Sequence, residues 1–91
     1  MLVLSECRVK PHISKADFER LMDEFARRAA EEELIAHYVK ADATGGFTIE
    51  EADDIRGAYE GALAYSEFLT FTITPILKID DAVGPILTYL G

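Results

Sequence analysis

Residues 69–77 alternate apolar side chains with threonines, and this alternation is the feature that most constrains the fold. The apolar positions are Phe71 and Ile73, and the polar positions are Thr70, Thr72 and Thr74. Successive side chains of a strand point to opposite faces, so the segment predicts a strand with one apolar and one polar or half-buried face. Pro75 has no backbone N–H to donate, which indicates an edge position or a bulge. The fold therefore contains a sheet whose two faces differ.

Three further segments are typical of strands, namely Leu2–Val9, Leu34–Ala41 and Gly46–Glu51. The link between the last two, residues 42–46, contains turn residues and two glycines, so these strands are predicted to form a hairpin. We expect Gly45 and Gly46 to serve the turn by adopting positive φ.

Helical signals separate the strands. Ser14 is a good N-cap with Asp17 at the N3 position of a capping box, and the helix that follows has an apolar stripe. That stripe consists of Phe18, Leu21, Met22, Phe25, Ala26 and Ala29. A second helix is predicted from Asp53 or Asp54, with Gly57 and Gly61 allowing its close approach to the sheet. Asp80 or Asp81 is predicted to cap a short C-terminal helix that runs to about Leu90, its first turns disturbed by Gly84-Pro85.

The resulting order, βαββαβ plus a terminal helix, predicts one α+β domain over residues 1–91. Right-handed crossovers of this order give a ferredoxin-like fold, with a four-stranded antiparallel sheet and two helices on one face. The other sheet face has no cover in so short a chain. Since an exposed apolar face is normally paired, we expect a homodimer.

The charge balance restricts the classes of partner. Nine basic and seventeen acidic residues give a net charge of −8, which argues against sequence-independent binding of nucleic acid. No stretch approaches the roughly 18 apolar residues of a membrane span, and no signal peptide is evident. A lone Cys7, expected to be a small buried hydrophobe, suits a cytoplasmic protein.

Four spaced motifs in the second half are similar to a family of small bacterial proteins of unknown function within the dimeric α+β-barrel superfamily. They are Gly45-Gly46-Phe47, the run from Ile49 to Asp54, Tyr65-Ser66-Glu67, and the run from Phe71 to Leu77. The resemblance implies two ferredoxin-like protomers that pack sheet against sheet around a central cavity. Tyr38 and Tyr65 fall where the family often has tryptophan. The superfamily includes cofactor-free monooxygenases, isomerases, haem enzymes and binding proteins, so the fold does not determine the function.

Four polar residues on the predicted strands are candidates for chemistry in that cavity: Arg8, His37, Tyr38 and Glu50. If Phe47, Ile49, Phe71 and Ile73 face the helices, then Thr48, Glu50 and the three strand threonines face the barrel interior. Glu6 and Arg8 would join them if they share that face. His37 and Tyr38 are adjacent and point to opposite faces, and the alternation of side chains does not determine which of the two faces the barrel interior. A histidine or carboxylate base with a tyrosine or arginine near an oxyanion would suit an oxygenase or isomerase. The alternative is an Arg8 ion pair and a solvated His37.

The sequence contains no spacing typical of a metal or dinucleotide site, and no cofactor is expected. The consecutive acids Glu31, Glu32 and Glu33 are read as a solvated helix end, or alternatively as a patch for a basic protein partner. The first hypothesis is therefore a homodimeric binding or protein-interaction module rather than an enzyme. The alternative is a cofactor-independent monooxygenase or isomerase that acts on a small organic ligand in the barrel cavity.

Overall fold

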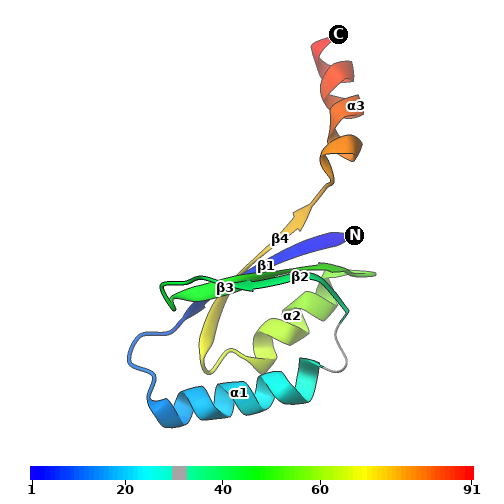
Figure 1. Ribbon diagram of the computed structural model, residues 1–91. Coiled ribbons are helices and arrows are strands. Elements are labelled where there is room, and N and C mark those ends of the chain that lie inside the picture. The colour runs from blue at the N-terminus through cyan, green and yellow to red at the C-terminus, as the bar shows by residue number, and fades with distance from the viewer. Residues whose placement is uncertain (30–32) are drawn as a thin grey trace.

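The computed structural model describes residues 1–29 and 33–91, which form four strands and three helices (Figure 1). In chain order these are β1 (Leu2–Val9), α1 (Lys15–Ala29), β2 (Leu34–Val39), β3 (Gly45–Glu51), α2 (Ile55–Ala64), β4 (Leu69–Ile76) and α3 (Ile79–Leu90). The sheet is antiparallel with strand order β2-β3-β1-β4. Helices α1 and α2 lie on one face of it. The predicted ferredoxin-like fold is confirmed, and β4 with Pro75 is an edge strand, as expected.

The helix starts follow the local signals in two cases out of three. The Ser14 hydroxyl accepts the Asp17 backbone N–H at 3.0 Å, and the Asp17 carboxylate accepts the Ser14 N–H at 2.9 Å, which confirms the capping box. Asp54 caps α2 by accepting the Arg56 N–H at 2.8 Å. Helix α3 begins instead after Lys78, so Asp80 and Asp81 lie in its first turn. Pro85 is accommodated within this helix.

The hairpin between β2 and β3 assigns its glycines a different role from the predicted one. Ala43 carries the positive φ, 66°, and Asp42 supports the turn by accepting the Thr44 N–H at 3.0 Å. Gly45 and Gly46 belong to β3 and have no positive φ. A Cβ on Gly45 would overlap the Cys7 carbonyl oxygen, and one on Gly46 would overlap that of Tyr38. The glycines are therefore needed for close approach of β1 and β2 to β3, and the turn prediction was wrong.

The strand register determines which side chains face the helices. Cys7 pairs with Phe71 and Gly46, and Ser5 pairs with Ile73 and Thr48. Directly paired residues share a face, so the helix face includes the residues Ser5, Cys7, Thr48, Glu50, Phe71 and Ile73. The opposite face, here called the open face, includes Leu2, Leu4, Glu6, Arg8, Tyr38, Phe47 and Ile49. The expectation that Phe47 and Ile49 face the helices while Thr48 and Glu50 face away was therefore wrong. The register of β3 against β1 places these residues on the opposite faces.

The hydrophobic core of the described chain is small. Its buried hydrophobic residues are Val3 in β1, Ala58 in α2 and Phe68 in the turn just before β4. No residue of α3 is buried. Most of the apolar side chains therefore remain partly or largely accessible in the single chain.

We predict opposite effects for two glycine-to-alanine substitutions. Gly45→Ala should lower the free energy of unfolding by about 1–3 kcal/mol, because its Cβ collides with backbone that cannot move freely. Gly57→Ala should raise it by about 0.5–1 kcal/mol, since a Cβ there meets nothing within 4 Å and a helical glycine is costly. Urea denaturation followed by circular dichroism measures both. Equal effects of the two substitutions would contradict the close-approach role of Gly45.

Candidate functional site

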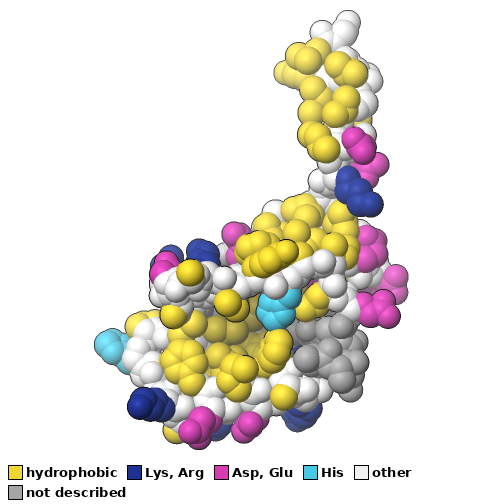
Figure 2. Space-filling model, in the orientation of Figure 1, with side chains coloured by type: hydrophobic (Ala, Val, Ile, Leu, Met, Phe, Trp, Pro, Cys, Tyr) yellow, Lys and Arg dark blue, Asp and Glu magenta, His cyan; other side chains and the backbone are white. Residues whose placement is uncertain are grey.

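A cavity of about 600 Å³ lies between the helix face of the sheet and the two helices that cover it. Figure 2 shows a hollow with hydrophobic side chains in this part of the molecule. The α1 wall is formed by Phe18, Leu21, Met22 and Phe25, which are four of the six residues of the predicted apolar stripe. They line the cavity instead of packing tightly on the sheet, and Met22 remains 57% exposed.

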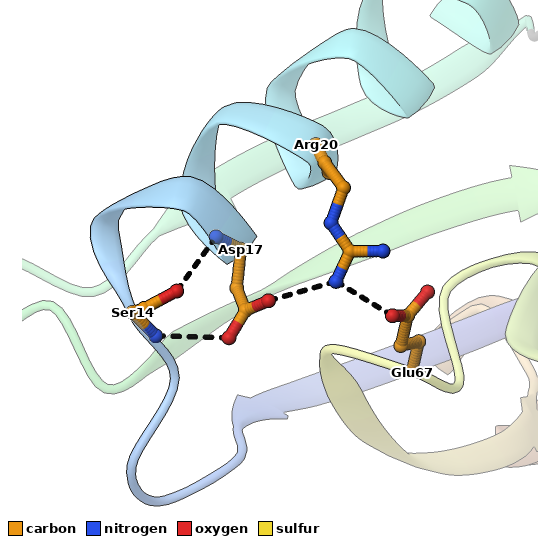
Figure 3. A network of polar contacts seen from close by, with 4 residues as sticks. All are labelled: Ser14, Asp17, Arg20 and Glu67. Atoms are coloured by element: carbon orange, nitrogen blue, oxygen red, sulfur yellow. Dashed lines mark hydrogen bonds and ion pairs between the residues drawn. The ribbon is translucent and has the colours of Figure 1, made fainter.

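Side chains hold α1 above the sheet. The Arg20 guanidinium lies 2.6 Å from the Glu67 carboxylate in the segment between α2 and β4, and 5.2 Å above the Phe68 ring (Figure 3). Further along α1, the Phe25 ring lies 5.3 Å from the His37 ring of β2. These contacts tie α1 to its surroundings while leaving open space beneath it.

The Arg20 guanidinium also contacts Asp17 at 2.7 Å, so one cation joins the helix cap to Glu67 (Figure 3). The hydrogen bond from the Ser14 backbone N–H, followed by that from Arg20, lowers the pKa of Asp17 below its usual value. The hydrogen bonds to Asp17 and Glu67 raise the pKa of Arg20. Both groups are therefore held in their charged forms at neutral pH.

Small residues of α2 form the opposite wall, namely Gly57, Ala58, Gly61 and Ala62. We expected Gly57 and Gly61 to bring α2 close to the sheet, but this was wrong. Among the described residues, a Cβ on Gly57 would meet nothing within 4 Å, and one on Gly61 would meet only the Arg28 guanidinium, at 3.9 Å. Their small size leaves space beside the cavity instead.

The polar part of the lining comes from the sheet. Ser5, His37, Thr48 and Glu50 all line the cavity, and Cys7 is half-buried beside them. Direct pairing of His37 with Thr48 places His37 on the helix face, and a β-bulge between Leu34 and Ala36 brings Leu34 to the same face. Two of the four candidate residues, His37 and Glu50, thus line one cavity. Glu50 is half-buried there, whereas His37 is exposed, as the alternative of a solvated His37 expected.

The other two candidates lie on the open face. The Tyr38 ring lies 5.5 Å from the Phe47 ring there, and Arg8 follows Glu6 on the same side of β1. Neither belongs to the cavity of its own chain. Of the three predicted interaction residues, Glu33 is exposed, while Glu31 and Glu32 lie outside the described residues.

The sequence did not indicate that Tyr65 and Arg28 belong to this site. Tyr65 lines the cavity after α2, and the Arg28 guanidinium lies 5.9 Å above its ring. Tyr65 was noted as part of a family motif and as a position where the family often has tryptophan, whereas Arg28 was not singled out. Their proximity depends on the packing of α1 beside α2, which no local pattern encodes.

Residues 1–29 and 33–91 contain no group of three or more His, Cys, Asp or Glu placed to hold a metal ion. None of their helices is long and apolar enough to cross a membrane.

A family model described as a domain of unknown function (DUF3303) matches residues 1–88. The chain belongs to this family. The predicted resemblance to a family of small proteins of unknown function is thereby confirmed. No curated protein matches the chain.

Among solved structures, the chain is similar to 5-chloro-2-hydroxyhydroquinone dehydrochlorinase from Burkholderia phenoliruptrix, determined in complex with 2,5-dihydroxybenzoquinone. The TM-score is 0.67 at 14% identity, over 85% of this chain and 94% of the other. At this identity the likeness shows the fold alone.

We predict that acid weakens the attachment of the α1 cap. The folded-state pKa of Asp17 is lowered, so its bonds contribute stability above the unfolded value of about 3.9 and lose it as the pH falls through the folded value. The measurement is urea denaturation of the native protein and of Asp17→Asn at pH 6 and at progressively lower pH. The difference in free energy of unfolding between them should shrink on acidification, and a constant difference would contradict this role of the carboxylate.

Proposed function

We propose that this protein binds a small, largely apolar organic ring compound in the cavity between the sheet and helices α1 and α2. The observation that carries the proposal is the cavity itself, whose volume of about 600 Å³ lies within the usual range for ligand pockets. Phe18, Phe25 and Phe71 supply aromatic surface for a ring. His37, Thr48 and Glu50 supply hydrogen-bonding groups for a hydroxyl or carbonyl on its edge.

The proposal includes a homodimer in the cytoplasm. The apolar side chains of the open face, which remain only half-buried in the single chain, and the superfamily of the fold support the dimer. The single half-buried cysteine is consistent with a reducing compartment. A basic protein partner at Glu31–Glu33 remains a hypothesis with less support, since only the exposure of Glu33 bears on it.

A second candidate function is proton transfer on the bound compound. It is favoured by the placement of an imidazole and a carboxylate on the same cavity-facing side of neighbouring strands, at His37 and Glu50. A base in a largely apolar cavity is the arrangement that a cofactor-independent isomerase or oxygenase uses. The dehydrochlorinase with a similar fold shows one such chemistry to test.

Filling the cavity should abolish ligand binding. We choose Gly61→Leu, because within the described part of the chain its new Cβ would have only the flexible end of Arg28 within 4 Å. With 2,5-dihydroxybenzoquinone as the probe, isothermal titration calorimetry should give a Kd at least about tenfold higher than for the native protein. The matched control is Glu60→Leu, which adds the same side chain at the exposed neighbouring position of α2. Equal binding by both variants would place the ligand elsewhere, and no binding by the native protein would remove this ligand class.

The catalytic candidate predicts that 5-chloro-2-hydroxyhydroquinone loses chloride in the presence of the native protein. His37→Gln should slow this release by about 10²–10⁴-fold if the imidazole acts as the base. His12→Gln is the matched control, because His12 is exposed before α1 and does not line the cavity. Chloride-electrode measurements that show no release above the uncatalysed rate would restrict the protein to binding this class of compound.

A further inference from the structure

Helix α3 stands apart from the body of the molecule. Figure 1 shows it beyond the end of β4, on the side of the sheet opposite to α1 and α2. The radius of gyration is 15.7 Å, whereas a compact domain of this length has about 12 Å. The chain is therefore shaped as a compact body with a projecting arm.

The surface of α3 does not suit permanent exposure to water. Its apolar positions repeat with helical spacing at Val83, Ile86, Leu87 and Leu90, and their exposed fractions are 41%, 50%, 63% and 73%. No charged residue occurs from Ala82 to the end of the chain. A helix of 12 residues is marginal in water by itself, and Gly84 and Pro85 weaken it further. Helix α3 therefore needs a surface to pack on.

The open face offers apolar surface on the same side of the sheet as α3. It contains Leu2, Leu4, Phe47 and Ile49, and Ile76 at the end of β4 leads from it toward α3. Figure 2 shows hydrophobic side chains on the end of the body nearest the projecting helix, and more along that helix. The open face and α3 thus form two sides of one angled apolar surface.

The amount of exposed surface matches what a second copy would cover. The chain exposes 6947 Å², whereas a compact monomer of its mass exposes roughly 5,300 Å², an excess of about 1,600 Å². Two chains that hid this excess would bury about 3,200 Å², within the range of obligate homodimers. The open face carries Glu6 and Arg8 on one strand, so two copies related by a twofold axis bring opposite charges to each other. An anionic membrane, by contrast, would repel a chain of net charge −8.

We propose that α3 is a dimerisation arm, which packs on a second copy of this chain while the two open faces pack against each other. The inference rests on the homodimer of the proposed function but not on its ligand. Because each arm lies at the margin of its own open face, the two arms hold the pair together from opposite ends. The exposed stripe of α3 is then covered by the partner rather than by the chain's own body.

A pair of substitutions on adjacent positions of α3 tests the arm. Leu87→Glu places a carboxylate in the apolar stripe, whereas Thr88→Glu adds the same charge on another side of the helix. Sedimentation velocity at micromolar concentrations should give a dimer for the native protein and Thr88→Glu. Leu87→Glu should raise the dimer Kd by at least about a hundredfold, because burial of an unpaired carboxylate is costly. Circular dichroism controls for folding of the body.

Photo-cross-linking distinguishes the arm from a helix that folds back on its own chain. Tyr89 is 89% exposed, so we replace it with the photoreactive amino acid p-benzoylphenylalanine. The proposal predicts covalent dimers after illumination, and cross-links within one chain or no covalent dimer would overturn it. A native monomer would overturn both the arm and the homodimer. A dimer that Leu87→Glu leaves intact would overturn only the arm, as would binding of α3 to phosphatidylcholine vesicles in place of a second copy.

Discussion

The height of α1 above the sheet is the constraint on which the site depends. Arg20 reaches Glu67 and Phe68, and Phe25 reaches His37, so long side chains span a distance that backbone packing would otherwise close. A helix seated directly on the sheet would bury Phe18 and Met22 and leave no cavity. Side chains that line this space are not buried against the sheet. The core therefore contains few fully buried residues among those described.

Local signals in the sequence were sufficient for most of the elements. The Ser14–Asp17 capping box, the alternation in β4 and the position of Pro75 each depend on residues close together in the chain, and each appears in the structure as predicted. The order of these elements then restricts the topology, because right-handed crossovers leave few alternatives. For this reason the fold could be predicted from the sequence.

The candidate site could be predicted from the sequence only in part. His37 and Glu50 could be named from their chemistry, but their common face depends on the register of β2 against β3, which a sequence does not display. Gly45 and Gly57 illustrate the same limit. Both are glycines of one chain, yet one is pressed against a neighbouring carbonyl and the other borders open space. A residue type alone does not distinguish these surroundings, because the neighbours come from distant segments.

The bulge in β2 bears on how this family can tolerate changes in length. Ile35 is the unpaired extra residue, and the pairing on either side of it is regular. Gain or loss of one residue at this point alters the connection from α1 without turning His37 or Val39 away from the cavity. The hairpin at the other end of β2 has no bulge that could absorb a change in length. A register slip of one residue there would place Tyr38 instead of His37 on the helix face. Among members of this family, we expect insertions and deletions at the α1 end of β2 and not at its hairpin end.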